Sequence, residues 1–109
     1  MPQAQRLKIV SPPGVSPWHP MTNPVDLKAL GKFGEELGEC TSATLRCIIQ
    51  GIDEAEPVTG KVNRVWLEEE IADVMATMRK VIERFSLDQK FLEARAFDKY
   101  QKLTVWHGM

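Results

Sequence analysis

A chain of 109 residues and 12.4 kDa is long enough to form one domain core and too short to form two. Its residues are 43% hydrophobic and 27% charged, which is typical of a globular protein and excludes a wholly disordered chain. Lys and Arg number 14 and Asp and Glu 15, a formal net charge of -1, so the chain lacks the overall positive field with which proteins hold a nucleic-acid polymer.

The N-terminal segment is predicted to be an extended arm. Residues 1–25 contain six of the seven prolines, which remove backbone donors and disfavour helix in the residue before each of them. The segment lacks the apolar stretch of a signal peptide, and no apolar run in the chain approaches the roughly 20 residues that span a bilayer. We therefore expect a cytoplasmic protein without a membrane segment, with the arm followed by one helical domain over residues 26–109.

An amphipathic helix is predicted from Asp26 to the residue before Gly51. Apolar side chains recur in this segment at intervals of three and four residues, the spacing of a helix with one buried face. Asn23 or Asp26 can cap its start, and Gly51 stands where a left-handed glycine often ends a helix. Cys40 and Cys47 fall on the apolar face about 10 Å apart at 1.5 Å per residue, so we expect two free thiols and no disulfide between them.

Two further helices are predicted in the second half of the chain. The same apolar spacing runs from Asn63 to Phe85, after a connection rich in turn-forming residues. A third helix is predicted to begin at Ser86, whose hydroxyl can cap the first turn while Gln89 reaches back as in a capping box. No segment has the period-two alternation of a strand. The predicted fold class is therefore all-α, a small antiparallel helical bundle.

The first two predicted helices share a pattern of acidic residues. Two acids, an apolar residue, a small residue and a third acid follow one another over residues 35–39 and again over residues 69–73. At about 100° per residue, the second and third of these acids lie on the same flank of the apolar stripe in each helix. If the two stripes face a common core, four carboxylates converge at one groove between the helices, those of Glu36, Glu39, Glu70 and Asp73.

Carboxylates that converge in this way need a cation. Two of them roughly 6 Å apart at an effective dielectric constant of about 20 repel each other by on the order of 3 kcal/mol. A ligand set of carboxylate oxygens without His or Cys favours a hard divalent ion, Mg²⁺ or Mn²⁺, over Zn²⁺ or copper. It also argues against a ferritin-like di-iron bundle, which uses Glu-x-x-His pairs. The alternative at this point is a solvated acidic face, which is common on surface helices.

The two acidic runs, followed by a basic third helix, resemble the all-α nucleoside triphosphate pyrophosphohydrolases of the MazG-like superfamily. The resemblance covers roughly residues 27–102. It implies hydrolysis of a nucleoside triphosphate between the α and β phosphates, which gives a monophosphate and pyrophosphate. It also implies Mg²⁺ ligands and catalytic acids, with Glu35 assisting a metal or orienting the attacking water; the ligands are Glu36, Glu39, Glu70 and Asp73, and the catalytic pair is Glu35 and Glu36.

Basic and aromatic residues near these acids are predicted to contact the substrate. A triphosphate is itself an anion, so cations are expected to complete its binding site beside the metal. Two of the cations lie on the flank of the first helix that carries the acids. Two others loosely match basic positions in the third helix of the MazG-like superfamily. A Trp offers a flat surface on which a base can stack. These residues are Lys32, Arg46, Lys99, Lys102 and Trp66. The alternatives are solvated charges for the cations and a packing role for the Trp.

Two other classes of function stay open, a non-catalytic helical interaction module and a nucleotide or metal sensor without turnover. We also expect a homo-oligomer, either a dimer or a tetramer. Three helices with broad apolar stripes, and 5 Met in the chain, leave more apolar surface than one small bundle usually covers. The resemblance points the same way.

Overall fold

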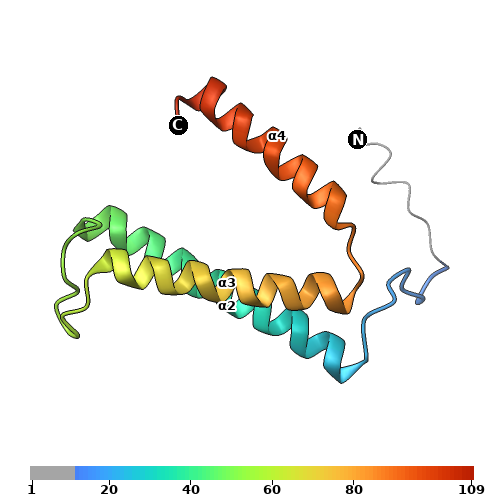
Figure 1. The fold of residues 1–109 in the computed structure, drawn as a ribbon. Coiled ribbons are helices and arrows are strands. Elements are labelled where there is room, and N and C mark those ends of the chain that lie inside the picture. Colours follow the sequence, from blue (N-terminus) through green and yellow to red (C-terminus); the bar gives the residue numbers. More distant parts are fainter. Residues whose placement is uncertain (1–11) are drawn as a thin grey trace.

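The computed structural model describes residues 12–109, and within this range the chain forms three helices and no strand. α2 spans Pro24–Gln50, α3 spans Asn63–Arg84 and α4 spans Gln89–His107 (Figure 1). The predicted all-α class is therefore confirmed. The predicted arm lies partly outside the described residues, and its described part before α2 contains no helix or strand. No helix in the described range has the length and apolarity needed to cross a bilayer.

A side-chain cap begins α2 and a backbone hydrogen bond of a glycine ends it. The Oδ1 atom of Asn23 accepts hydrogen bonds from the backbone N–H groups of Val25 and Asp26, at 2.9 and 3.2 Å. Of the two predicted caps, Asn23 is thus the one used, and Pro24 occupies the first turn, where its missing N–H costs nothing. Gly51 ends the helix with a φ of 106° and donates its N–H to the Cys47 carbonyl, although its ψ of 135° lies outside the left-handed helical region that the sequence suggested.

α2 and α3 form an antiparallel hairpin (Figure 1). Ala43 and Val81 are buried where the helices touch, with exposed fractions of 2% and 6%. The far end of the hairpin is tied by an ion pair between Arg84 Nε and Asp26 Oδ1 at 2.6 Å. The helices are therefore held together along their length by small apolar contacts and at this end by charge.

A buried asparagine closes the connection between α2 and α3. Asn63 has no exposed surface, and its Nδ2 atom donates to Gln50 Oε1 at 3.1 Å and to the Gly51 carbonyl at 3.0 Å. Beside it, Arg64 binds Asp53 through two hydrogen bonds of 2.8 and 3.1 Å. The connection is thus held by side chains at the point where the chain reverses.

α4 does not join the core of the hairpin. In Figure 1 it turns back after α3 and rises away from the other two helices, and among its residues only Leu103 is half-buried, the others being exposed. The predicted capping box at Ser86 is wrong, because α4 begins at Gln89 and the Asp88 carboxylate caps it by accepting from Phe91 N–H at 3.0 Å. Ser86 instead has a φ of 50° and lies in the turn before the helix. The third helix therefore leaves the predicted bundle incomplete in the single chain.

Helix periodicity gives the hairpin two sides of opposite character. Successive residues of a helix are rotated by about 100°, so residues that flank the line where α2 and α3 touch face one of two opposite sides. Exposed apolar residues of both helices lie on one side of this contact line, and charged residues lie on the other. The apolar side is defined by Leu30, Leu37, Leu45, Ile48, Ile71, Met75 and Met78, all of them exposed in the single chain. The charged side is defined by Lys32, Glu36, Glu39, Arg46, Glu69, Asp73 and Lys80.

The substitution Asn63→Ala is expected to lower the free energy of unfolding by about 1–3 kcal/mol, because Gln50 and the Gly51 carbonyl lose their shielded donor. Urea unfolding followed by circular dichroism measures this loss. Val58→Ala in the same connection is the control, since Val58 is 90% exposed and its truncation should change stability by no more than about 0.5 kcal/mol. Equal small changes in both variants would contradict the role given to Asn63.

Candidate metal centre

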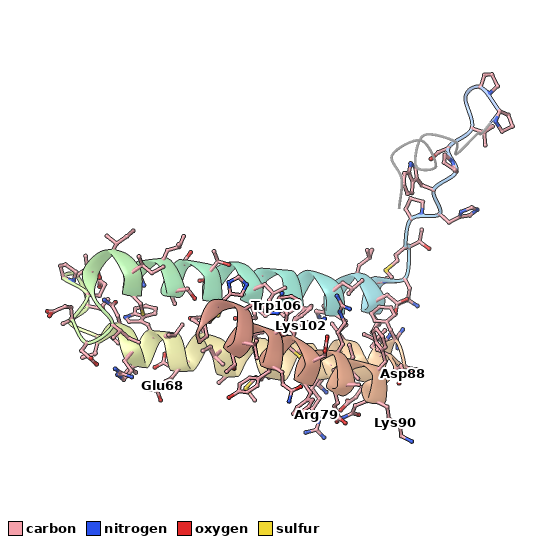
Figure 2. The ribbon with its side chains drawn as sticks, turned by 90° about the horizontal axis from the view of Figure 1, so that it is seen from above. Glu68, Arg79, Asp88, Lys90, Lys102 and Trp106 are labelled. Atoms are coloured by element: carbon pink, nitrogen blue, oxygen red, sulfur yellow. The ribbon has the colours of Figure 1, made fainter. Side chains whose placement is uncertain are left out.

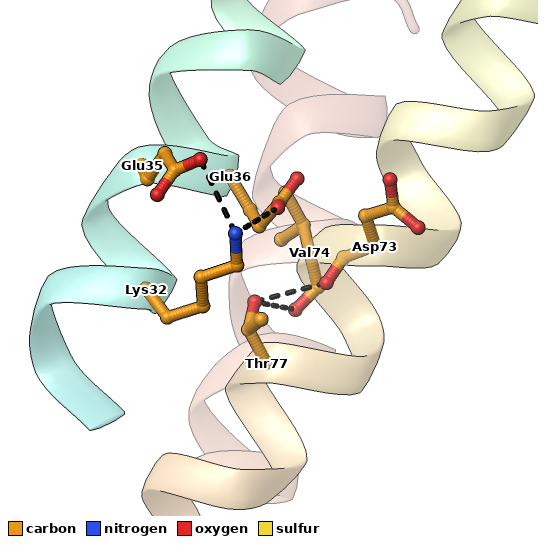
Figure 3. Close-up of polar contacts among 6 residues, drawn as sticks. All are labelled: Lys32, Glu35, Glu36, Asp73, Val74 and Thr77. Carbon is orange, nitrogen blue, oxygen red and sulfur yellow. Dashed lines mark hydrogen bonds and ion pairs between the residues drawn. The ribbon is translucent and has the colours of Figure 1, made fainter. Parts of the chain in front are cut away.

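Three of the four predicted metal ligands come together on the charged side of the hairpin. Glu36 of α2 and Glu70 and Asp73 of α3 each offer a carboxylate oxygen, and these oxygens lie within 4.8 Å of one another. Glu36 and Glu70 are half-buried and Asp73 is exposed. Figure 3 shows Glu36 reaching from α2 toward α3 beside Asp73. Glu39 is exposed and stands outside this group of three, which we call the carboxylate cluster.

The position of the cluster follows from the packing of the hairpin. Glu36 and Glu70 lie next to the residues where the helices touch, so both are carried partly under the neighbouring helix. Asp73 is one turn from Glu70 on the exposed flank. Behind it, the Thr77 hydroxyl donates to the backbone carbonyls of Asp73 and Val74 at 2.9 and 3.2 Å (Figure 3). The cluster is thus built from regular helix on both sides and not from a loop.

Glu70 is the electrostatically strained member of the cluster. Burial raises the pKa of its carboxyl above the ordinary 4.5, and the charges of Asp73, Glu39 and Glu36 raise this pKa further. Its Oε2 atom is buried and has no hydrogen-bond partner among residues 12–109. Glu39 is therefore close enough to act on Glu70 although it lies outside the cluster.

Lys32 is the cation that the hairpin places beside the cluster. Its Nζ atom lies 3.2 Å from Glu35 Oε1 and 3.6 Å from Glu36 Oε1 (Figure 3). The hydrogen bond and charge of Glu35, followed by Glu36, raise the pKa of this lysine. Glu35 is exposed and faces Lys32, so the structure places it at the edge of the cluster and not among its three oxygens.

The donor set fits a hard divalent cation. All three groups offer carboxylate oxygens, which Mg²⁺ and Mn²⁺ bind in preference to softer ligands. The buried Glu70 Oε2, which has no hydrogen-bond partner within residues 12–109, is an acceptor that such a cation would satisfy. If bound there, the ion would be held by Glu36, Glu70 and Asp73.

Trp66 and two cations lie near the end of the charged side that faces the connection. Arg46 Cζ is 5.2 Å and Lys61 Nζ 4.4 Å from the centroid of the Trp66 ring, both within cation–π range. The Nε1 atom of Trp66 is buried without a hydrogen-bond partner in the described part of the chain. Lys61 also binds the Glu69 carboxylate at 2.8 Å. The structure thus brings the predicted residues Arg46 and Trp66 together. Cations, however, lie against the Trp66 ring, which was expected to offer its surface to a base.

Lys61 was not predicted from the sequence as a site residue. It precedes Glu69 by eight residues, and only the fold of the connection carries its ammonium group to Glu69 and Trp66. An isolated Lys between turn-forming residues gives no periodic signal, so sequence reasoning had no means of finding it.

Lys99 and Lys102 lie apart from the carboxylate cluster. Lys102 pairs with Asp98 of its own helix at 2.7 Å and lies 5.6 Å from the centroid of the Trp106 ring. Both lysines line a shallow hollow whose walls all come from α4. Figure 2 shows Lys102 and Trp106 together on that helix. In the single chain, therefore, α4 adds no cation to the cluster.

Comparison with known proteins finds no family model, curated protein sequence or solved structure that matches this chain.

Without divalent cations, Glu70→Gln is expected to raise the free energy of unfolding near pH 7 by on the order of 1 kcal/mol. This is the repulsion energy of two unit charges about 4 Å apart in a water-like dielectric, which the neutral side chain removes. A raised pKa means that the folded chain binds the Glu70 proton more tightly than the unfolded chain, whose pKa is near 4.5. Wild-type stability therefore falls as pH rises from about 4.5 through the raised pKa, and the variant escapes this loss.

Urea unfolding in EDTA at a series of pH values measures the difference between the two proteins, which should grow through this window and then become constant. The matched control is Glu68→Gln, because Glu68 is exposed and points away from α2 (Figure 2). A Glu70→Gln variant that is less stable than the wild type near pH 7 would contradict the electrostatic account.

Proposed function

We propose that this chain is a Mg²⁺-dependent nucleoside triphosphate pyrophosphohydrolase, which cleaves between the α and β phosphates and releases pyrophosphate. The observation that carries the proposal is the carboxylate cluster, three acids from two helices with oxygens within 4.8 Å of one another. A site of like charges binds a polyanion only through a cation, which links this donor set to phosphate chemistry. The resemblance of the acidic runs to the MazG-like superfamily supports the choice of the α–β bond.

The acidic residues have separate roles in this proposal. Glu36, Glu70 and Asp73 hold the metal, and Glu39, one turn along α2, approaches as a further ligand. A bound Mg²⁺ supplies charge neutralisation between acids and phosphates, polarises the phosphorus and lowers the pKa of water. Glu35 accepts a hydrogen bond from Lys32 at the edge of the cluster, where its exposed carboxylate can orient the attacking water.

The cations of the charged side lie on both flanks of the cluster along the hairpin. Lys32 lies one turn before Glu36 on α2. Trp66 precedes Glu70 by four residues, about 6 Å along the helix axis, and carries Arg46 and Lys61 against its ring. A triphosphate at the cluster would therefore meet a cation in either direction. In this arrangement Trp66 holds the two cations, and it would stack on a base only where one of them moves off the ring.

The proposal predicts that the full chain, incubated with Mg²⁺ and a panel of nucleoside triphosphates, converts at least one of them to monophosphate and pyrophosphate. Ion-exchange chromatography identifies the products. Glu36→Gln and Asp73→Asn should each lower the rate at least about 100-fold, since replacing even the groups behind metal ligands commonly costs 10- to 100-fold. Glu68→Gln, on the outer face of α3, should retain the wild-type rate.

Other products or the absence of turnover would contradict the proposal in distinguishable ways. A nucleoside diphosphate with orthophosphate would show cleavage at the wrong bond. Thermal stabilisation by a nucleotide or by Mg²⁺ without turnover would indicate a sensor. Neither turnover nor stabilisation would indicate a helical interaction module in which the acids form a solvated face.

A further inference from the structure

A hollow rich in lysine lies beside the carboxylate cluster on the charged side of the hairpin. It opens between the first turns of α2 and the second half of α3, and its volume of about 230 Å³ gives room for a group much larger than water. Its walls are almost entirely apolar, so the lysines line it with their methylene stems. We call it the basic hollow, and the residues that line it are Val25, Lys28, Ala29, Lys32, Thr77 and Lys80.

The basic hollow begins where the carboxylate cluster ends. Lys32 lies one turn before Glu36 on α2, and its Nζ atom is 3.6 Å from Glu36 Oε1. On α3, Thr77 lies one turn after Asp73 (Figure 3). Because the two helices run antiparallel, both steps lead away from the cluster in the same direction, toward the start of α2. A ligand with several charged groups can therefore reach from the cluster into the hollow.

The basic hollow carries positive charge that the described part of the chain does not neutralise. No ion pair among residues 12–109 includes Lys28 or Lys80, and both residues are exposed. Of the three lysines of the hollow, Lys32 alone is paired in this range, with Glu35 and Glu36. Ammonium groups gathered around one hollow repel one another, and an anion bound among them relieves this repulsion. The apolar walls favour such binding further, because charges attract more strongly where water is excluded.

The cations at the other end of the charged side are already engaged. Lys61 binds Glu69 at 2.8 Å, and Arg46 and Lys61 both lie against the Trp66 ring. The basic hollow instead offers two lysines that have no acidic partner among the described residues. It is therefore the part of the charged side that is best suited to an additional anion.

We propose that the basic hollow binds the terminal phosphates of the nucleoside triphosphate whose α phosphate lies at the carboxylate cluster. The identity of this ligand rests on the proposed function, whereas the charge and the position of the hollow do not. In this arrangement the phosphate chain runs from the cluster toward the start of α2, and the nucleoside lies toward Trp66. Lys28 and Lys80, neither of which was predicted from the sequence as a site residue, thus become residues that select a triphosphate.

The position of Lys80 explains how the hollow would select by the number of phosphates. Lys80 follows Asp73 by seven residues, about 10 Å along the helix axis at 1.5 Å per residue. A helical side chain leans toward the N-terminus of its helix, which for Lys80 is the direction of the cluster. A monophosphate at the cluster would leave this distance open, whereas the β and γ phosphates extend along it. The lysines therefore favour ligands with more than one phosphate.

Isothermal titration calorimetry of the full chain with inorganic pyrophosphate in Mg²⁺ tests the hollow without turnover. The wild type should bind pyrophosphate, and Lys28→Met and Lys80→Met should each weaken this binding about 10-fold. Each substitution removes a charged hydrogen-bond donor and keeps a stem of similar length. The matched control is Lys90→Met, which removes the same charge from an exposed residue of α4 and should bind as the wild type does (Figure 2).

Turnover separates this inference from the proposed function. The two lysine variants should lower kcat/KM for a nucleoside triphosphate about 10-fold, while Mn²⁺ uptake and helix content stay as in the wild type. Turnover with unchanged kcat/KM and unchanged pyrophosphate binding in both variants would overturn the inference and leave the proposed function standing. A wild type that binds no pyrophosphate, or equal weakening by Lys90→Met, would also overturn it. Pyrophosphate binding that depends on the two lysines, without turnover of any nucleotide, would support the hollow as a phosphate site and refute only the proposed function.

Discussion

Repulsion among acids at the contact of two helices is the constraint on which this structure depends. Glu36, Glu70 and Asp73 bring their oxygens within 4.8 Å of one another, and Glu70 has a raised pKa as a result of burial and these neighbours. The hairpin keeps them together because it is fastened beyond them in both directions. Asn63 closes the connection, and the ion pair of Arg84 with Asp26 ties the opposite end. The interactions at the two ends of the hairpin thus hold together carboxylates that repel one another in the isolated chain.

The same periodicity that gathers the acids leaves the other side of the hairpin apolar. In a helix of 3.6 residues per turn, residues on one flank of the contact line cannot share the environment of those on the other. The charged side can therefore remain open to a polar ligand while the apolar side is available for association. α4 completes neither side within one chain, because nearly all its residues are exposed and its lysines lie apart from the cluster.

Regular helix made much of the fold predictable from the sequence. Apolar spacing gave the all-α class, and the Asn23 cap and the end of α2 at Gly51 follow from local chemistry. The spacing of the acidic residues predicted that Glu36, Glu70 and Asp73 lie close together, but it did not predict that Glu39 lies outside this group. The predicted start of the third helix at Ser86 differs from the observed start of α4, because Ser86 and Asp88 are both good caps and only the turn geometry selects Asp88. The contacts of Lys61 depend on the folded connection and have no counterpart in periodicity.

Binding of Mn²⁺ to the metal-free protein tests the central claim most directly, because electron paramagnetic resonance distinguishes free from bound ion. The account predicts that the wild-type chain removes the free-ion signal until about one ion is bound per carboxylate cluster. Asp73→Asn should abolish this uptake and Glu68→Gln should leave it unchanged, while both variants stay helical. Equal uptake by the wild type and Asp73→Asn, or no uptake by the wild type, would contradict the assignment of the cluster as a metal centre.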